Sequence, residues 1–426
     1  MKSQGGITMN NKTYLCIDLK SFYASVECVE RGIDPFKINL VVADPTRGGG
    51  AITLAATPAI KKLGVPSRGR IYEIPKGIEY ITATPRMTLY MKYSAKVYSI
   101  FMKYISSEDI HVYSIDESFL DVTSYLSLYQ MTAKRLAKTI LDDIYNELGL
   151  CATVGIGTNL FLAKVALDIT AKHAKDFMGY LDEDLFKQLI WHHKPITDIW
   201  MIGQGTANRL ATLGITDLYG VAHCPEKILY KMFGVNAEYL IDHAWGKEPT
   251  EISDIKSYQP SSNSISNSQI LFEDYNYQDA YLIMKEMVET NVLQLVEKHL
   301  VTNHIALTIG YSKNVIKPSR GSCKITNTTN SYKILLNEFK QLYKKIVNPN
   351  YPIRQIGISF GNVKDEYYEQ LDLFADIEDI EKEKRVQEAL VSIRNKYGKN
   401  AVLKGMNFYE KATQRKRNGL VGGHNA

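Results

Sequence analysis

Two adjacent carboxylates, Asp116 and Glu117, interrupt a mostly apolar, β-prone stretch at residues 111–121. Side chains alternate faces along a strand, so the two acids cannot both point into one core, and neither should be fully buried without a partner. A turn between two strands, or a bound metal, would account for them. A third acid, Asp18, stands where the apolar run 14–17 ends and a helical pattern begins.

Three carboxylates at strand ends can form a metal site. A single Asp at such a place is usually a helix cap or a turn residue. The combination instead favours a phosphoryl-transfer enzyme, in which one cation activates the attacking oxygen and another steadies the leaving phosphate. Hard Mg²⁺ suits carboxylate, carbonyl and phosphate oxygens, so we expect two Mg²⁺ ions, with Mn²⁺ as a substitute.

Two long segments carry a family resemblance. Residues 18–27 (Asp-Leu-Lys-Ser-Phe-Tyr-Ala-Ser-Val-Glu) and 114–121 (Ser-Ile-Asp-Glu-Ser-Phe-Leu-Asp) resemble the paired signature of the Y-family DNA polymerases, closest to the bacterial UmuC/DinB-like branch with its ImpB/MucB/SamB group. Residues 154–166 resemble the family segment that follows a palm strand and offers a lysine to the incoming triphosphate. The similarity continues through the thumb into the C-terminal region and covers most of the chain.

The resemblance assigns roles to the acidic residues. Asp18 and Asp116 would bind both metals, and the Leu19 carbonyl would bind one of them. Glu117 would join the metal site on the side of the primer terminus. No side chain stands out as a general base, so rate would come from positioning and from charge stabilisation of an in-line attack on the α-phosphate.

The resemblance also implies a nucleotide site. Tyr23 would be the steric gate, a ring under the sugar that leaves no room for a 2′-hydroxyl, whereas Phe22 fits either nucleotide binding or core packing. Lys164 would be the palm lysine for the triphosphate, and Lys61 holds a fingers position where the family has Arg or Lys. Pro58 stands where many relatives have a tyrosine that touches the triphosphate, so that hydrogen bond is not expected.

Two further motifs would contact macromolecules. Gly203 and Gly205 lie between two helical patterns and resemble a helix-hairpin-helix, in which glycine lets backbone amides approach a DNA phosphate. A plain helix-helix turn is the other interpretation. The segment 370–374 resembles the peptide that binds the bacterial β sliding clamp, with the anchors Gln370, Leu371, Leu373 and Phe374. The basic run 411–417 fits a DNA-tracking segment or a solvated tail.

Bulk composition narrows the class of protein. A chain of 426 residues with a net charge of +5 is too long for one core and mildly basic, which is compatible with nucleic acid without identifying it. The five cysteines show neither a disulfide framework nor zinc-ligand spacing, and no apolar run would cross a membrane. We therefore expect a cytoplasmic protein, whose physiological start is Met1 or Met9.

The pattern of elements predicts an α+β multidomain protein, and the resemblance makes it a right-handed polymerase. We expect a ferredoxin-like palm at 12–34 and 76–175, small fingers at 35–75, a helix-hairpin-helix thumb at 176–250, a βαββαβ little finger at 257–364, and a charged tail at 365–426 in which 376–397 can be helical. Expected fingers strands are 40–44 and 51–57.

The sequence thus predicts a low-fidelity, template-directed DNA polymerase for translesion synthesis, DNA repair and SOS mutagenesis. It would use primer-template DNA and deoxynucleoside triphosphates, with the sliding clamp and accessory SOS proteins as partners. A palm-type nucleotidyl cyclase and a non-catalytic accessory protein that binds clamp and DNA remain alternatives. Activity without DNA would identify the cyclase, and primer extension would exclude the accessory.

Overall fold

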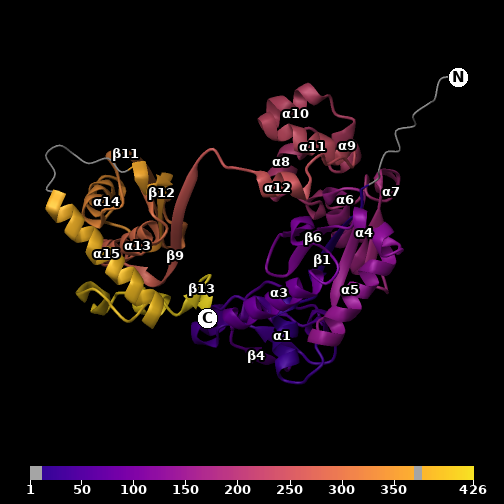
Figure 1. Ribbon diagram of the computed structural model, residues 1–426, viewed down its shortest axis with the longest axis horizontal. Coiled ribbons are helices and arrows are strands. Elements are labelled where there is room, and N and C mark those ends of the chain that lie inside the picture. The colour runs from indigo at the N-terminus through magenta and orange to yellow at the C-terminus, as the bar shows by residue number, and fades with distance from the viewer. Residues whose placement is uncertain (1–11, 369–376) are drawn as a thin grey trace. The chain divides into compact units, whose positions relative to one another are not determined.

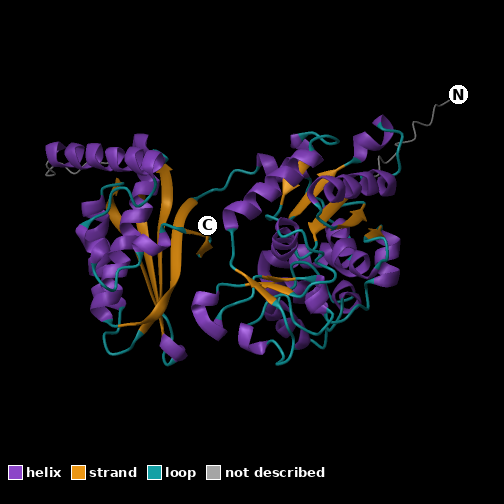
Figure 2. Ribbon diagram, turned by 90° about the horizontal axis from the view of Figure 1, so that it is seen from below, coloured by secondary structure: helices purple, strands orange, loops and turns teal. Residues whose placement is uncertain are grey.

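The computed structural model describes residues 12–368 and 377–426. The chain forms two compact units (Figure 1): one comprises the chain up to Tyr258 together with His424–Ala426, and the other is Gln259–Gly423. Each unit mixes helices and strands, as Figure 2 shows. An α+β multidomain architecture is therefore confirmed.

The first unit is built on a five-stranded sheet in the order β5-β6-β1-β7-β8. Central strand β1 runs antiparallel to β6 and β7, whereas β7 and β8 are parallel. The strand bounds are β1 (Tyr14–Leu19), β5 (Ile110–Val112), β6 (Glu117–Asp121), β7 (Ala152–Gly157) and β8 (Met178–Leu181). The register pairs Asp18 with Glu117 across β1 and β6, so both side chains leave the same face of the sheet.

Two glycines of β7 let a helix lie directly on that face. Helix α6 (Leu160–Val165) begins after Asn159, whose side chain accepts a hydrogen bond from Leu162 N. A Cβ atom at Gly155 would stand 2.0 Å from the Ala163 carbonyl oxygen, and one at Gly157 would stand 2.1 Å from the Ala163 nitrogen. Only glycine fits these positions, and the close approach brings α6 over the carboxylate end of the sheet.

Further helices complete the sheet domain. Helix α5 packs on β7 and α3 packs on α5. Both follow the expected pattern, with apolar residues on one face and Gly149 in a left-handed conformation (φ 67°) ending α5. The bounds are α1 (Phe22–Glu30), α3 (Met87–Phe101), α4 (Thr123–Leu128), α5 (Ala133–Leu148) and α7 (Glu183–Leu189).

A small three-stranded sheet has the order β3-β2-β4, and its core contains Val41, Ala56 and Ile60. Its strands β2 (Leu40–Val42) and β3 (Ala55–Ala56) are shorter than the expected 40–44 and 51–57. The third strand, β4 (Ile81–Ala83), lies beyond the expected fingers boundary at residue 75. Helix α2 (Pro58–Lys61) begins with proline, as its sequence predicts.

A helical region follows α7, and its buried residues, among them Leu210, Val221 and Leu229, share one core with residues of α6 such as Phe161 and Leu162. Its helices are α8 (Gln204–Ala211), α9 (Leu218–Ala222), α10 (Glu226–Phe233), α11 (Ala237–Ala244) and α12 (Ile252–Ser257). None of the described helices is long and apolar enough to cross a membrane.

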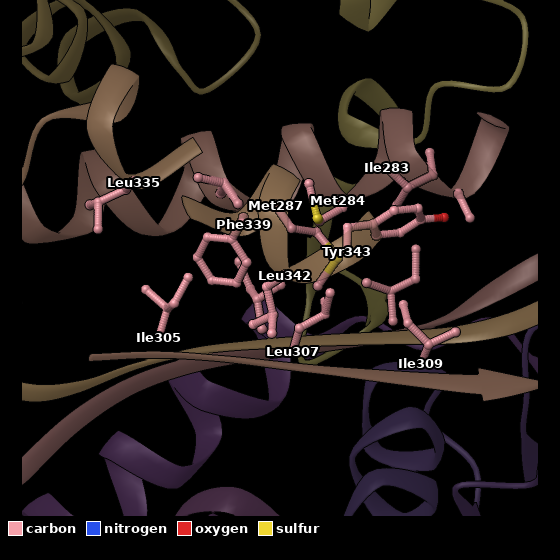
Figure 3. Packing of buried hydrophobic residues seen from close by; sticks show 14 of the residues in the cluster. Ile283, Met284, Met287, Ile305, Leu307, Ile309, Leu335, Phe339, Leu342 and Tyr343 are labelled. Atoms are coloured by element: carbon pink, nitrogen blue, oxygen red, sulfur yellow. The ribbon is translucent and has the colours of Figure 1, made fainter. Parts of the chain in front are cut away.

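The second unit is a βαββαβ arrangement around an antiparallel sheet in the order β11-β10-β12-β9. Two long helices cover one face of this sheet, and Figure 3 shows their side chains meeting Ile305, Leu307 and Ile309 of β10. The bounds are β9 (Asn263–Tyr275), α13 (Tyr277–Glu297), β10 (Leu300–Tyr311), β11 (Ser319–Thr329), α14 (Tyr332–Ile346) and β12 (Ile353–Asp365).

The C-terminal region differs from the expected tail. Helix α15 (Ile377–Tyr397) packs on α13 through the nearly buried pair Arg394–Glu289, and Asn407 donates to buried Glu286. In the run 411–417, Thr413 is buried and its backbone N–H also donates to Glu286, so part of this basic run is packed and not a solvated tail. The remaining elements are α16 (Gln414–Arg417), β13 (Leu420–Val421) and β14 (His424–Asn425).

Candidate active site

The three acids meet where β1 ends and β6 begins. A turn separates β5 from β6, and the backbone N–H groups of Tyr113 and Ser114 donate to the Glu117 carbonyl at 3.0 Å. This turn is the arrangement that the paired acids predicted. Leu19 N donates to the Asp116 carbonyl oxygen at 2.9 Å, which ties the turn to the end of β1. Asp18, Asp116 and Glu117 are all partly exposed.

Electrostatic repulsion among these acids is strong. Burial, followed by the charges of Asp116 and Glu117, raises the pKa of Asp18 to about 7, although Lys164 and Lys172 oppose the shift. A divalent cation would relieve this repulsion, and the available donors are the carboxylate and carbonyl oxygens that Mg²⁺ prefers. The chemistry of the donor set therefore fits the metal. Over 12–368 and 377–426, no three Asp, Glu, His or Cys side chains already form a closed metal-binding cluster.

Glu117 is held by a buried lysine. Lys164 Nζ lies 2.9 Å from the Glu117 carboxylate and 3.0 Å from Asp168. The thiol of Cys16, two residues before Asp18 on the same face of β1, donates to Glu117 at 3.2 Å. Lys164 is 7% exposed, and its ammonium contacts the carboxylates of Glu117 and Asp168.

A second lysine, Lys172, follows Lys164 along the chain and is more exposed. Lys172 is half exposed, pairs with Asp168 at 3.0 Å, and is close enough to Asp18 and Lys61 to lower their pKa values. The sequence interpretation missed it. The signal was available, because Lys164, Asp168 and Lys172 recur every four residues and therefore follow one helical face.

Lys61 also points to this site. Its ammonium donates to the Ser21 hydroxyl at 2.8 Å, and Ser21 itself adopts a left-handed conformation (φ 53°) between β1 and α1. Burial, together with the charges of Lys20 and Lys172, lowers the pKa of Lys61, while Asp18 opposes that shift. Lys20, Lys61 and Lys172 thus lie near the end of β1 that carries Asp18. Pro58 begins α2 and is buried.

The two aromatic residues of α1 have different surroundings. Phe22 is 2% exposed and packs edge-on against Tyr90, as a core residue does. Tyr23 is partly exposed and stacks on Tyr90 with ring centroids 4.4 Å apart. Burial, and then the charge of Asp116, raises the pKa of Tyr23.

The motifs for macromolecules are less defined. Gly203 precedes α8 and Gly205 lies in its first turn; both are exposed, and no atom lies within 4 Å of a Cβ built at either position. They leave space for a backbone to approach. The segment 370–374 lies outside the described residues.

Comparisons with known proteins identify the family. Two family models match, described as the impB/mucB/samB family (residues 17–168) and the impB/mucB/samB family C-terminal domain (residues 262–373). A Bacillus subtilis protein named as the UV-damage repair protein UvrX is 31% identical over 97% of both chains. A DNA polymerase IV from the same organism is 28% identical over 98% of this chain and 99% of the relative.

The fold agrees with these relatives. The solved structure of a Y-family DNA polymerase chimera of Dbh and Dpo4 matches with a TM-score of 0.64 and 21% identity, over 83% of this chain and 99% of that one. At that identity the match shows the fold alone. Together with the family models, it establishes that the chain belongs to the impB/mucB/samB family, the UmuC/DinB-like Y-family DNA polymerases.

Proposed function

We propose that the chain is a low-fidelity DNA polymerase that extends a primer 3′-OH on damaged templates, with Asp18, Asp116 and Glu117 as its catalytic carboxylates. The observation that carries this proposal is the geometry of the acids: Asp18 pairs with Glu117 across β1 and β6, and Leu19 N donates to the Asp116 carbonyl oxygen at 2.9 Å. Burial, and then the charges of Asp116 and Glu117, raises the pKa of Asp18 to about 7, which fits a site that a cation would stabilise.

Y-family DNA polymerases are generally dependent on divalent metal ions. In this chain Asp18, Asp116 and the Leu19 carbonyl would hold two Mg²⁺ ions, with Glu117 on the primer side. When bound, the ions would activate the primer hydroxyl and neutralise charge on the triphosphate. The protein's own contribution is to keep the acids together where β1 ends and β6 begins. The pairing of Asp18 with Glu117 and the 2.9 Å hydrogen bond from Leu19 N to the Asp116 carbonyl oxygen hold these two strand ends in place.

The triphosphate would lie against the lysines. Lys61 and Lys172 flank Asp18 from two different segments, so a polyanion arriving there would meet positive charge on both sides. We assign triphosphate contact to these two residues. Lys164 is instead a positioning residue, because its ion pair orients Glu117 from below.

The sugar would lie on Tyr23. The Tyr23 ring is partly exposed beside Asp116 and is backed by a second ring, so it cannot retreat when a 2′-hydroxyl approaches. This arrangement supports the role of steric gate. Phe22 belongs to the packing beneath it.

Primer-template DNA would contact the chain at further places. Gly203 and Gly205 expose backbone at the start of α8, which suits a phosphate contact. Gln370, Leu371, Leu373 and Phe374 would dock on the bacterial β sliding clamp, and we infer a cytoplasmic protein that acts with SOS accessory proteins. The cyclase and the non-catalytic accessory protein are not favoured, because the chain's relatives are named as DNA polymerases.

Primer extension tests the proposal. The purified chain, supplied with Mg²⁺, should extend primers on undamaged and damaged templates. Asp116→Ala should abolish extension while DNA binding and the thermal transition stay nearly unchanged, because this acid is not part of the core. Retained extension above about one per cent, roughly 2.7 kcal/mol of lost transition-state stabilisation, would contradict the assignment.

A further inference from the structure

The ring behind Tyr23 belongs to a fully buried tyrosine. Tyr90 of α3 is 0% exposed, and its plane lies 14° from that of Tyr23, with ring centroids 4.4 Å apart. Phe22 meets the same ring edge-on, with centroids 6.4 Å apart and an angle of 61°. Tyr90 therefore supports both aromatic residues at the start of α1.

The hydroxyl of Tyr90 is anchored by a buried carboxylate. It donates to Glu27 Oε1 at 2.8 Å, and Arg86 donates to both Glu27 oxygens at 2.9 and 2.8 Å. Arg31 also donates to this carboxylate, whose side chain is 0% exposed. Burial alone would raise the pKa of Glu27, but the hydrogen bonds from Arg86, Arg31 and Tyr90 lower it, so Glu27 remains ionised and keeps its donors.

We propose that Tyr90 is a positioning residue for sugar selection: its ring, fixed by Glu27, forms the rigid back wall that prevents Tyr23 from yielding to a 2′-hydroxyl. The inference rests on the proposed role of Tyr23 as the steric gate. A gate excludes a hydroxyl only if its ring cannot shift by the width of one oxygen atom. A stacked, fully buried ring held by a buried ion pair provides that resistance.

The same helix offers a matched control. Tyr93, also on α3, is 8% exposed, and its hydroxyl donates to Glu30 of α1 at 2.7 Å. Among the described residues, no ring contact joins Tyr93 to Phe22 or Tyr23. Both tyrosines thus lie buried on α3 and donate to a glutamate of α1, although Glu30 is exposed and Glu27 is buried, and only Tyr90 contacts the ring of Tyr23.

The test measures sugar discrimination, the ratio of kcat/KM for a deoxynucleotide to that for the matching ribonucleotide, in the full chain. Tyr90→Leu removes the flat wall and should lower this ratio at least about tenfold, whereas Tyr93→Leu should change it less than about twofold. Tyr90→Phe keeps the ring but lacks the hydroxyl that donates to Glu27, and it should lower the discrimination ratio only about threefold. Tyr23→Ala serves as the reference for complete loss of the gate.

The outcomes distinguish a failure of the Tyr90 wall from a failure of the Tyr23 gate. If Tyr23→Ala loses discrimination while Tyr90→Leu retains it, the back wall is overturned and the gate stands. If Tyr23→Ala leaves discrimination unchanged, the gate itself fails. A Tyr90→Phe ratio equal to the parent's would overturn the anchoring by Glu27. Should Tyr90→Leu not fold, Tyr90→Met fills similar volume without a flat face, and unchanged discrimination in it would overturn the inference equally.

Discussion

The ammonium of Lys164 lies 2.9 Å from the carboxylate of Glu117, and the two side chains are only 9% and 10% exposed. This pair joins α6 to the strand that carries the proposed primer-side acid. It exists because Gly155 and Gly157 let α6 approach the sheet without a side chain between them. The lysine that the sequence assigns to the triphosphate thus also contacts an acid, and Lys172 is the more exposed of the two lysines.

Lys164→Met should destabilise the protein strongly. Removing Lys164 leaves the buried Glu117 without its ammonium partner, while Asp168 keeps Lys172, and breaking a buried ion pair typically costs about 3–5 kcal/mol. The free energy of unfolding, measured with urea and without metal, should fall by that order, and primer extension should fall with it.

Lys172→Met is the matched control for that substitution. This lysine is half exposed, so the free energy of unfolding should change by less than about 0.5 kcal/mol. If Lys172 meets the triphosphate, the KM for deoxynucleotides should rise about tenfold, or about 1.4 kcal/mol. A Lys164→Met protein as stable as its parent, with only a raised KM, would return the triphosphate role to Lys164.

The sequence located the acids, the main sheets and the long helices because each has a strong local pattern. It did not reveal that β4 belongs to the small sheet, since this three-residue strand joins it only through a parallel partner about forty residues away, Leu40 beside Ile81. It also indicated a helix at 376–397, where α15 lies, but not that this helix packs on α13. Polar contacts such as Arg394–Glu289 hold it there, and they leave no apolar periodicity to detect.

The sequence could not indicate that Lys164 is buried against Glu117. The sequence indicates that Lys164 and Lys172 share a helical face, but not which of the two is buried against the sheet and which is exposed. That choice depends on how closely α6 approaches β7, which the Gly155 and Gly157 contacts determine. The distance between a helix and the sheet on which it packs is a property of the tertiary structure.

Asp18 should make the metal-free protein less stable as pH rises. Its pKa is raised to about 7 in the folded state and is about 3.9 in an unfolded chain. Between these values the folded state binds more protons than the unfolded state, so stability falls from pH 4 to pH 7 and the loss is complete above pH 7. Asp18→Asn should flatten this dependence in urea melts with chelator present.

Mg²⁺ provides the control for that measurement. Because a cation relieves the repulsion among the acids, added Mg²⁺ should stabilise the parent more at pH 8 than at pH 5, and should stabilise Asp18→Asn less than the parent at pH 8. Identical pH profiles for parent and variant would show that Asp18 is not the strained acid.

Gly155→Ala should be among the most disruptive small substitutions. Its Cβ atom would stand 2.0 Å from the Ala163 carbonyl and 2.2 Å from Leu167 N, so α6 would have to move away from β7 and take Lys164 with it. We expect a loss of about 3 kcal/mol or more, at the upper end for overpacking. Thermal or urea unfolding measures this loss of stability.

Gly205→Ala makes the same substitution at a position where the added methyl group has room. No atom lies within 4 Å of the added methyl group, and alanine favours a helix, so stability should be unchanged or rise by up to about 1 kcal/mol. Weakened DNA binding in this variant, at unchanged stability, would support the phosphate contact. An equal loss of stability at Gly155 and Gly205 would refute the packing argument.

The last prediction concerns the proposed clamp peptide, residues 370–374. Replacing Leu373 and Phe374 with alanine removes two apolar anchors, and such truncations typically cost about 2 kcal/mol or more each, about a thirtyfold loss of affinity apiece. Distributive primer extension should persist, while stimulation by loaded clamp and binding to purified clamp should disappear. As a control, alanine at Val386 and Ile393, exposed apolar residues of nearby α15, should leave clamp binding unchanged. If the Leu373/Phe374 variant still binds clamp as tightly as the parent, or if the control loses binding equally, recruitment runs through another surface, because apolar anchors act only where they enter a groove.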